Sequence, residues 1–309
     1  MTGFLRRAPA RMGAFCLLAV ISAWSADRPA VRRMTADIRV DSNLVLIPVS
    51  VTDPRNHPVT GLHREDFRVF EGKAEQTLLH FAAEDAPVSV GIVFDASGSM
   101  RDKLAQSRAA VARFLDTAGP GDEFFLVNFS ANPEIAVPFT RDAGAIQNRL
   151  LYTGSEGRTS LLDAICLATD YMKHAGNPRR ALLVISDGVD NHSRYTEAEI
   201  RSRVRESDIW IYTIAICDRG AIMLPEEVHG ETLLEGISGE SGGRLFAVRN
   251  PAEMPEIAAN IGLELRNQYL IGYRPSNAAG GPRYRKVQVK VVAGRALRVA
   301  WRPGYFMPE

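Results

Sequence analysis

The sequence predicts an α/β fold, with a doubly wound, mostly parallel six-stranded sheet and a short β-rich segment on either side of it. Between residues 87 and 268, apolar runs of strand length alternate with amphipathic, helix-like stretches, which is typical of a parallel sheet covered on both faces. Before and after that region the pattern is of strands alone, separated by turn clusters. Because each flank is too short to bury a sheet by itself, we expect the two to pair into one small β-sandwich.

Composition is that of an ordinary globular protein. The chain has 309 residues, 46% hydrophobic and 24% charged, which is enough for one large domain or two smaller ones. Its 37 Lys and Arg are balanced by 36 Asp and Glu, so no net field attracts nucleic acid or an anionic membrane. The three cysteines form no C-x-x-C pair and the six histidines no H-x-x-x-H pair, which argues against a zinc site.

Residues 1–26 have the pattern of a secretory signal peptide. Three arginines precede an apolar run of about 15 residues that ends in small residues, and we place the cleavage near Ser25 or Ala26. The run is shorter than the roughly 20 residues of a spanning helix, although an uncleaved anchor is an alternative. We therefore predict an exported protein, periplasmic, cell-envelope or extracellular, with no membrane span in the mature chain.

Export bears on the two remaining thiols, Cys166 and Cys217. An oxidising compartment could pair them, but we place one on a helix and the other at a strand end. Two unpaired, half-buried thiols are the preferred interpretation, since the sequence gives no sign that the two Cα atoms approach each other.

The elements follow in order along the chain. A polar linker over 27–36 leads to the first β segment, 37–86, and the last β segment is 269–309. Strands of the two flanks are predicted at 44–51, 67–70, 77–81, 268–273, 286–292 and 297–301. In the α/β region, strands are predicted at 88–94, 124–129, 135–139, 181–186, 209–216 and 244–248. Helices are predicted at 100–117, 145–152, 161–173, 196–206, 232–237 and 254–265.

Oxygen-bearing side chains follow two of these strands. Asp95, Ser97 and Ser99 come after the strand 88–94, and Asp187 comes after the strand 181–186; Thr159 stands just before a helix. In an open α/β sheet, such residues gather outside the carboxyl ends of the strands, near a switch point of the topology. Hydroxyl and carboxylate oxygens are ligands that Mg²⁺ or Mn²⁺ prefers. The alternative is that Ser97 and Ser99 only cap a helix that begins near Met100.

With these residues in view, residues 87–268 resemble the von Willebrand factor A domain and its metal-ion-dependent adhesion site. The D-x-S-x-S motif of that family matches Asp95, Ser97 and Ser99, its threonine loop matches Thr159, and its downstream aspartate matches Asp187. The resemblance implies that the three hydroxyls contact the cation, while the two aspartates act largely through water molecules.

The flanks carry a second resemblance. The stretches 49–53, 59–62 and 302–305, together with 186–191 and 269–273, are similar to the VWFA-related Acidobacterial domain family. This similarity extends from about Asp37 to Phe306 and implies a shared architecture, but no mechanism.

The leading hypothesis is an exported, noncatalytic adhesion or scaffold module. An ion held mainly by hydroxyls stays electrophilic, so a partner protein's Asp or Glu could complete its shell. Partner contacts are expected on the rim of the metal site, which includes a long loop at 218–230. The candidates there are Arg158, Tyr195, Ile222, Met223 and Leu224, with Tyr152 of the same chemical kind.

Two alternatives stay open. One is a metal-assisted hydrolase, for which Glu226, Glu227, His192 and His229 offer no ordered set and no catalytic motif is present. The other is a structural envelope module with a vestigial metal site.

Three smaller features have ordinary structural interpretations. Asp190 and Asn191 are expected to form a turn or cap, although a second cation is an alternative. Asp163 is expected to favour a helix dipole, and the basic run 283–286 to guard a solvated strand edge.

Overall fold

The computed structural model describes residues 44–217, 225–276, 283–293 and 296–307. The predicted signal peptide, its cleavage point and the linker lie outside these residues, as do Ile222, Met223 and Leu224. Within the part of the chain that is described, no helix is both long and apolar enough to cross a membrane. Residues 42–309 make up one compact unit.

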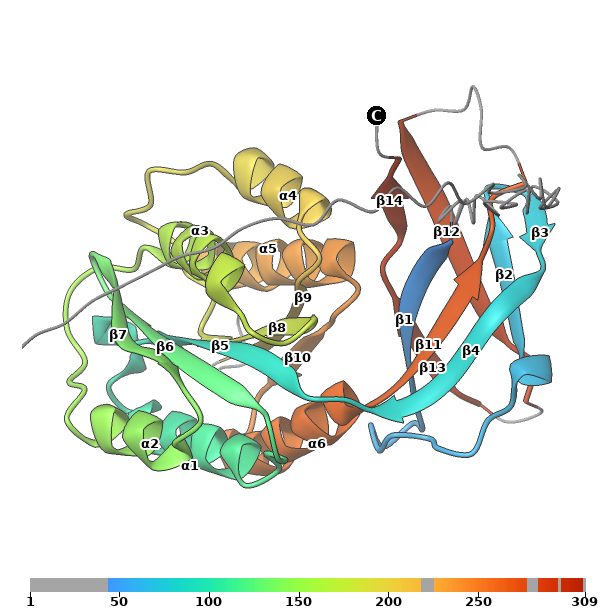
Figure 1. Ribbon diagram of the computed structural model, residues 1–309. Coiled ribbons are helices and arrows are strands. Elements are labelled where there is room, and N and C mark those ends of the chain that lie inside the picture. Colours follow the sequence, from blue (N-terminus) through green and yellow to red (C-terminus); the bar gives the residue numbers. More distant parts are fainter. Residues whose placement is uncertain (1–43, 218–224, 277–282, 294–295, 308–309) are drawn as a thin grey trace, which may run out of the picture. The chain divides into compact units, whose positions relative to one another are not determined.

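The centre of this unit is the predicted six-stranded sheet, in the order β10-β9-β8-β5-β6-β7 (Figure 1). All its strands are parallel except β7, which pairs antiparallel with β6 at the edge. That edge place suits β7, because two prolines interrupt its hydrogen-bonding potential. The strands are β5 (Val88–Asp95), β6 (Glu123–Phe129), β7 (Pro133–Thr140), β8 (Arg179–Ser186), β9 (Trp210–Ile216) and β10 (Leu245–Val248).

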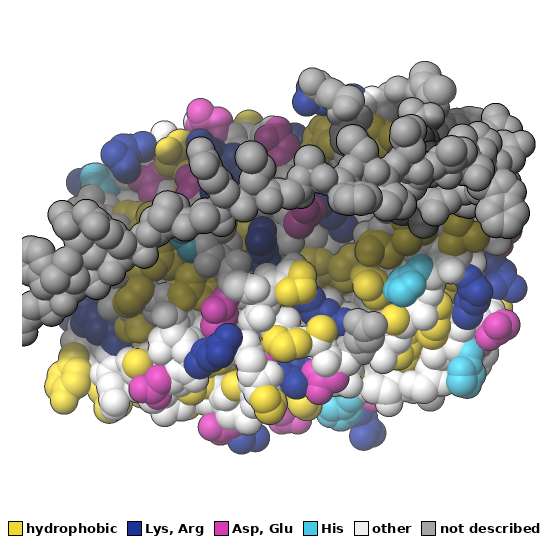
Figure 2. Space-filling view, viewed as in Figure 1, with side chains coloured by type: hydrophobic (Ala, Val, Ile, Leu, Met, Phe, Trp, Pro, Cys, Tyr) yellow, Lys and Arg dark blue, Asp and Glu magenta, His cyan; other side chains and the backbone are white. Residues whose placement is uncertain are grey.

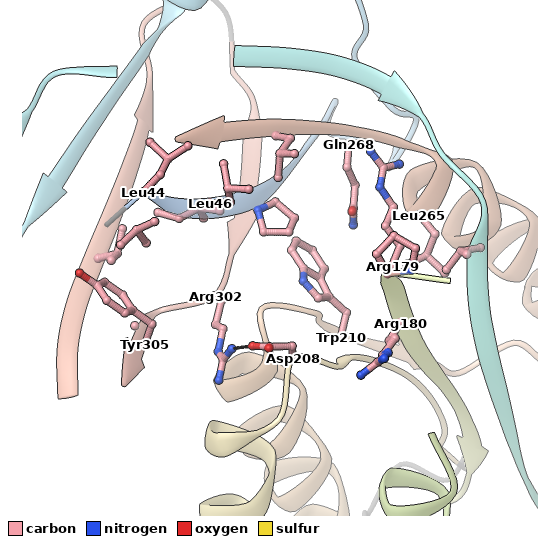
Figure 3. Close-up of a pocket in the computed structure, with 18 of the residues that line it drawn as sticks. Leu44, Leu46, Arg179, Arg180, Asp208, Trp210, Leu265, Gln268, Arg302 and Tyr305 are labelled. Carbon is pink, nitrogen blue, oxygen red and sulfur yellow. Dashed lines mark hydrogen bonds and ion pairs between the residues drawn. The ribbon is translucent and has the colours of Figure 1, made fainter. Parts of the chain in front are cut away.

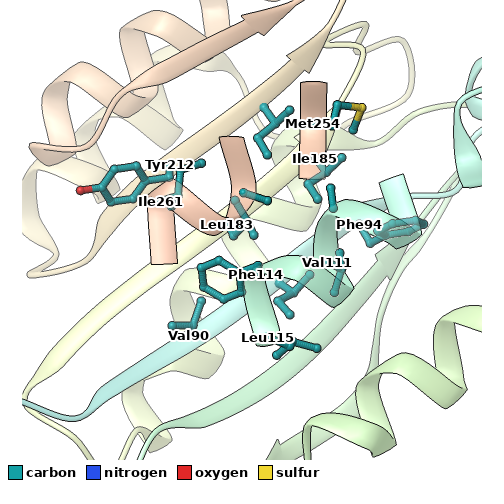
Figure 4. Packing of buried hydrophobic residues seen from close by; sticks show 14 of the residues in the cluster. Val90, Phe94, Val111, Phe114, Leu115, Leu183, Ile185, Tyr212, Met254 and Ile261 are labelled. Atoms are coloured by element: carbon teal, nitrogen blue, oxygen red, sulfur yellow. The ribbon is translucent and has the colours of Figure 1, made fainter. Parts of the chain in front are cut away.

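Three helices cover each face of this sheet (Figure 1). Successive side chains of β5 lie on alternate faces of the sheet, so Val90 and Ile92 point into one apolar core and Val93 into the other. Figure 4 shows the first core, where Phe114 and Ile261 from two helices meet residues of the sheet. One face carries α1 (Leu104–Leu115), α2 (Ala143–Leu151) and α6 (Met254–Arg266), and the other carries α3 (Leu161–Tyr171), α4 (Glu197–Glu206) and α5 (Pro225–Ser241).

Two helices differ from the prediction. The helix expected from Met100 begins only at Leu104, after a 3-10 turn over Gly98–Met100. The short helix expected at 232–237 is the 17-residue α5, so the predicted long loop is wrong from residue 225 onward. Three glycines in α5 weaken its helical pattern, and one of them has a tertiary reason: a Cβ on Gly230 would lie 2.3 Å from the carbonyl oxygen of Gly188.

Strands from the two flanks combine, as predicted, into two small sheets that share one core. Their orders are β13-β1-β11-β4 and β14-β12-β2-β3. β1 pairs with both β11 and β13, and β12 pairs with β2, so each sheet needs both ends of the chain. The strands are β1 (Val45–Thr52), β2 (Phe67–Glu71), β3 (Ala74–Gln76), β4 (Leu78–Asp85), β11 (Asn267–Tyr273), β12 (Tyr284–Val291), β13 (Arg298–Trp301) and β14 (Gly304–Phe306).

The basic run at 283–286 does not guard an edge, and that prediction is wrong. Tyr284 to Lys286 belong to β12, which lies between β14 and β2. The Arg285 side chain is 4% exposed, and its guanidinium pairs with Glu71 at 2.7 Å. The Tyr273 and Tyr305 hydroxyls donate to the other oxygen of that carboxylate, which ties the two sheets together. Opposite charge across neighbouring strands explains why an arginine is accepted inside the sandwich.

A buried acid connects the sandwich to the α/β region. Glu264 of α6 accepts hydrogen bonds from Ser50 of β1 at 2.7 Å and from Tyr212 of β9 at 2.9 Å. It also pairs with Arg244, which in turn donates to Asn56 at 2.9 Å. Four segments far apart in sequence thus meet at one carboxylate.

Two further features agree with the sequence. Cys166 on α3 and Cys217 just after β9 are not bonded to each other, although both are buried and not half-buried as predicted. Charged side chains of both signs are scattered over the face seen in Figure 2, without a patch of either sign among the described residues there. This distribution fits the balanced net charge.

Candidate metal site

The predicted site lies where two neighbouring strands end. β5 pairs in parallel with β8, with Phe94 opposite Ile185, so Asp95 and Asp187 follow at the same edge of the sheet. The chain passes from β5 to β6 on one side and returns to β8 on the other, which makes this edge a switch point of the topology. Sheet order alone therefore brings the two aspartates together.

Asp95 is fully buried at the end of β5. One carboxylate oxygen accepts the Ser97 backbone N–H at 2.8 Å, and the other accepts the Ser186 hydroxyl at 2.6 Å. Burial, together with the negative charge of Asp187, raises the pKa of the Asp95 carboxyl to about 7. A nearby cation would favour the ionised form of this group.

Ser97 and Ser99 do not cap a helix, so the capping alternative is wrong. Ser97 flanks the 3-10 turn without a side-chain cap hydrogen bond, and α1 starts after Lys103 instead. The two hydroxyl oxygens lie 3.1 Å apart. Ser97 is buried whereas Ser99 is exposed. Two oxygens at this spacing, one of them open to solvent, are suited to share one small cation.

Thr159 is held beside the motif by backbone hydrogen bonds. The Gly98 N–H donates to the Gly157 carbonyl at 3.1 Å, and the Glu156 N–H donates to the Ala96 carbonyl at 2.9 Å. Thr159 is 3% exposed, and its own N–H donates to the Asn191 side chain at 3.0 Å. Backbone hydrogen bonds thus join the threonine loop directly to the D-x-S-x-S turn.

Asp190, Asn191 and Asp163 build the loops around the site. Asp190 accepts the Leu162 N–H at 2.9 Å, at the start of α3, so it acts as a cap supplied by another segment. Asp163 accepts the backbone N–H groups of Arg194 and Tyr195, at 2.9 and 3.1 Å. Asp163 is in the first turn of α3, as predicted for a residue that favours the helix dipole, and it also holds the loop at 194–195.

Asp187 has one oxygen without a partner. Its Oδ1 is buried and accepts no hydrogen bond from the described residues, whereas its Oδ2 lies 3.5 Å from Lys103 Nζ. A buried acceptor without a donor is costly, so this atom is suited to a cation or to a water molecule bound to one. Lys103, which is 12% exposed, places a positive charge beside the same carboxylate.

The residues present therefore fit a magnesium or manganese ion. Two acids and three hydroxyls supply only oxygen donors, the chemistry that these cations prefer. Among the residues described, no group of three or more His, Cys, Asp or Glu side chains is arranged so that it could hold a metal ion. The contact of Lys103 with the site was not predicted. Lys103 lies four residues after Ser99, one turn into the region expected to be helical, and this position could have indicated that its side chain lies near the motif.

The rim residues differ in exposure. Arg158 is exposed, and Tyr152 is the most open large aromatic residue described, at 84%. Tyr152 also lines a cavity of about 410 Å³ that includes Ala96 of the motif turn. Tyr195 is half-buried against the core, with the Arg203 guanidinium 5.3 Å from its ring centre, so it has a packing role.

Comparison with known proteins identifies the domain that contains these loops. Residues 90–189, from β5 to just after β8, match the family model for the von Willebrand factor type A domain. The chain contains a von Willebrand factor type A domain. The strand order of its six-stranded, mostly parallel sheet fits that assignment. The matched segment includes the D-x-S-x-S turn, the threonine loop and Asp187.

Curated relatives share this domain at low identity. An uncharacterized protein from Borreliella burgdorferi is 24% identical over 200 residues, which is 57% of this chain and 58% of the relative. Inter-alpha-trypsin inhibitor heavy chain H4 from Sus scrofa is 28% identical over 132 residues, 39% of this chain and 14% of the relative. The chain thus spans less than two thirds of each.

Solved structures show only a weak overall likeness. A von Willebrand factor type A protein from Catenulispora acidiphila has 15% identity and a TM-score of 0.49, over 64% of this chain and 52% of that one. An aerotolerance-related membrane protein from Bacteroides fragilis has 19% identity and a TM-score of 0.47, over 57% and 98%. The domain assignment rests on the family model and the strand order.

Proposed function

We propose that this protein is an exported, noncatalytic binding module. In this proposal, the von Willebrand factor type A domain holds Mg²⁺ or Mn²⁺ at Asp95, Ser97, Ser99, Thr159 and Asp187. The ion in turn captures an Asp or Glu side chain of a partner protein.

The observation that carries the proposal is the unpartnered oxygen of Asp187 beside a second buried acid. Two carboxylates without a cation repel each other, and the raised pKa of Asp95 has this repulsion as one of its causes. A divalent ion would relieve the repulsion and supply the missing partner at once.

The donor set also supports a role in recognition. Ser97, Ser99 and Thr159 contribute neutral oxygens, so little negative charge would be donated to the ion directly. An ion of this kind keeps its attraction for an incoming carboxylate. The exposed Tyr152 and Arg158 lie on the same loop, between α2 and α3, and such side chains are common anchors in protein interfaces.

We favour binding over hydrolysis because a general base has no arranged partner. The side chains of His192 and His229 are exposed, and neither is hydrogen bonded to an acid or nucleophile within the described ranges. Catalysis by a metal-bound water would need a base within hydrogen-bond reach.

Metal binding can be tested by isothermal titration calorimetry of Mg²⁺ and Mn²⁺ into the chelator-treated protein. We expect binding by the natural protein and its loss in Asp95→Ala with Ser97→Ala. Because Asp95 is buried, Ser99→Ala provides a second variant whose exposed side chain is not needed for folding. Asp170→Ala removes a half-exposed acid of α3 and serves as the control.

A further variant, Lys103→Met, tests whether the positive charge beside Asp187 weakens cation binding. Loss of the neighbouring positive charge should strengthen Mg²⁺ binding by about tenfold, or about 1.4 kcal/mol. Titrations in which no variant differs from the natural protein would contradict the assigned ligands.

Partner binding is tested separately, by capture from a cell-envelope extract with Mg²⁺ or with chelator. The proposal expects a partner that is retained only with the metal, and that the Ser99→Ala protein fails to retain. Retention that is undiminished in chelator would rule out capture through the ion.

A further inference from the structure

A cavity of about 410 Å³ lies at the amino ends of the strands of the six-stranded sheet, whereas the metal site lies at their carboxyl ends. The cavity is lined by Val88, Arg179 and Trp210, which are at or near the amino ends of β5, β8 and β9, whereas Asp95 and Asp187 follow carboxyl ends. Its other wall is formed by β1 and β11 of the sandwich. A volume of this size is within the usual range of small-molecule sites, about 300–1,000 Å³.

The walls of this cavity are largely apolar (Figure 3). Leu46 and Pro48 come from β1, Leu270 from β11 and Leu265 from α6, and the Trp210 indole lies among them. Leu46 is 49% exposed although it belongs to the sandwich, so its apolar surface is not covered by the described residues. Contiguous apolar surface of this kind favours an apolar ligand.

Two buried polar atoms among the residues that line the cavity have no hydrogen bond of normal geometry to a described residue. One is Nε2 of Gln268, a side chain that is 4% exposed and lies beside the Tyr212 hydroxyl. Arg180 Nε is likewise buried without an acceptor, and the Arg180 guanidinium forms no ion pair within the described part of the chain. In Figure 3, Gln268 and Arg180 lie on either side of the Trp210 indole. Buried donors without acceptors are rare, and they indicate a missing acceptor.

The lining contains more arginines than acids. Arg302 pairs with Asp208, an acid that also lines the cavity, whereas Arg180 forms no ion pair with a described acid. A guanidinium without a carboxylate partner, at the end of an apolar cavity, favours a ligand with an anionic head.

We propose that this cavity binds a medium-chain fatty carboxylate. The alkyl chain would lie along Leu46, Pro48 and Trp210, and the carboxylate oxygens would accept hydrogen bonds from Arg180. The Gln268 amide offers a further donor in the same cavity. This site is independent of the proposed metal site, since the two share no residue and lie at opposite ends of the strands.

The test is calorimetric titration of decanoate into the full chain, with 1-decanol and butanoate as comparison ligands. Decanoate should bind at least tenfold more tightly than either, because decanol lacks the charge and butanoate lacks the chain. Binding should also change the fluorescence of Trp210, and that change should be lost in Trp210→Phe.

Arg180→Gln should weaken decanoate binding at least tenfold and leave decanol binding unchanged. The matched control, Arg113→Gln, removes an exposed arginine of α1 that does not line the cavity. Leu46→Glu should weaken both ligands, whereas Leu151→Glu, at an exposed leucine of α2, should weaken neither.

Absence of decanoate binding, or equal binding of decanoate by the Arg180→Gln protein, would overturn the proposal. Tighter binding of decyl phosphate than of decanoate would also overturn it, since the head group would then be a phosphate. None of these titrations requires the divalent ion, so they can succeed or fail independently of metal binding.

Discussion

At the residue scale, Asp95 carries a carboxylate that is fully buried and close to a second acid. Burial and the charge of Asp187 raise its pKa from 3.8 to about 7. A pKa that is higher in the folded protein than in the unfolded chain means that the folded protein binds the proton more tightly. The stability from this proton is fully present below about pH 4, and it is lost as the pH rises to about 7.

The resulting prediction concerns Asp95→Asn in chelator. Its free energy of unfolding, relative to the natural protein, should rise between pH 4 and pH 7 and then level off, because in that range the folded natural protein keeps a proton that its unfolded chain has already released. Urea unfolding of both proteins at several pH values measures this difference, and other titrating groups cancel in it. A difference that does not vary with pH would show that Asp95 titrates normally. Added Mg²⁺ should stabilise the natural protein more at pH 8 than at pH 5.

Two glycines of α5 provide a second prediction at this scale. A Cβ on Gly230 would lie 2.3 Å from the Gly188 carbonyl oxygen, whereas a Cβ on Gly239 would meet no atom within 4 Å. Gly230→Ala should therefore cost roughly 1–3 kcal/mol of stability, and Gly239→Ala should add up to about 1 kcal/mol through helix propensity. Thermal or urea unfolding of the pair tests this. Equal effects of the two substitutions would mean that α5 does not approach Gly188 so closely.

At the element scale, the buried pair of Arg244 and Glu264 connects β1, β9 and α6. Removal of one partner of a buried ion pair leaves the other charge without compensation, which typically costs about 3–5 kcal/mol. Arg244→Met should therefore destabilise the protein by roughly 3 kcal/mol, and adding Glu264→Met should restore much of that loss. Arg113→Met, which removes one partner of an exposed pair with Asp116, should cost at most about 1 kcal/mol.

Urea unfolding of these variants measures the coupling between the two charges. Glu264→Met alone is measured as well. If the destabilisation of the double variant equals the sum of the two single effects, the two charges do not act as a pair.

Some strands and helices could be predicted from the local sequence pattern, and others could not. The apolar strands of the six-stranded sheet were predictable because they are long and continuous, and β7 because its prolines indicate an edge. β3 and β14 have three residues each, which is too short for a period to show. The start of α1 was wrong because the motif turn is held by contacts to Gly157 and Ser155, which are distant in sequence.

At the scale of the whole molecule, both ends of the chain enclose the α/β region and complete one sandwich. Ser50 contacts Glu264, Arg302 pairs with Asp208, and Arg266 of α6 pairs with Asp85 at 2.6 Å. These contacts join the two parts at several places. Loss of either part would expose buried charged groups of the other.

We therefore predict that the sandwich and the α/β region unfold together. Trp301 reports on the sandwich and Trp210 on the sheet, so two variants that each retain only one of these tryptophans can be compared, with Trp24 replaced in both. Their urea midpoints should coincide, as expected for one cooperative unit. Two separate transitions would show that the two parts are independent.

The sequence by itself predicted the α/β class, the order of the longer strands and helices and the pairing of both flanks, and it named the five oxygen-bearing residues that we propose as metal ligands. These follow from hydrophobic period and from motif spacing, which are local or depend only on element order. The tertiary structure decided what depends on approach between distant segments. It placed Lys103 beside Asp187, made Arg285 a buried partner of Glu71, and left Arg180 Nε and Gln268 Nε2 buried without acceptors among the described residues. The cost of a buried charge depends on its three-dimensional neighbours, and neither hydrophobic period nor motif spacing along the chain specifies them.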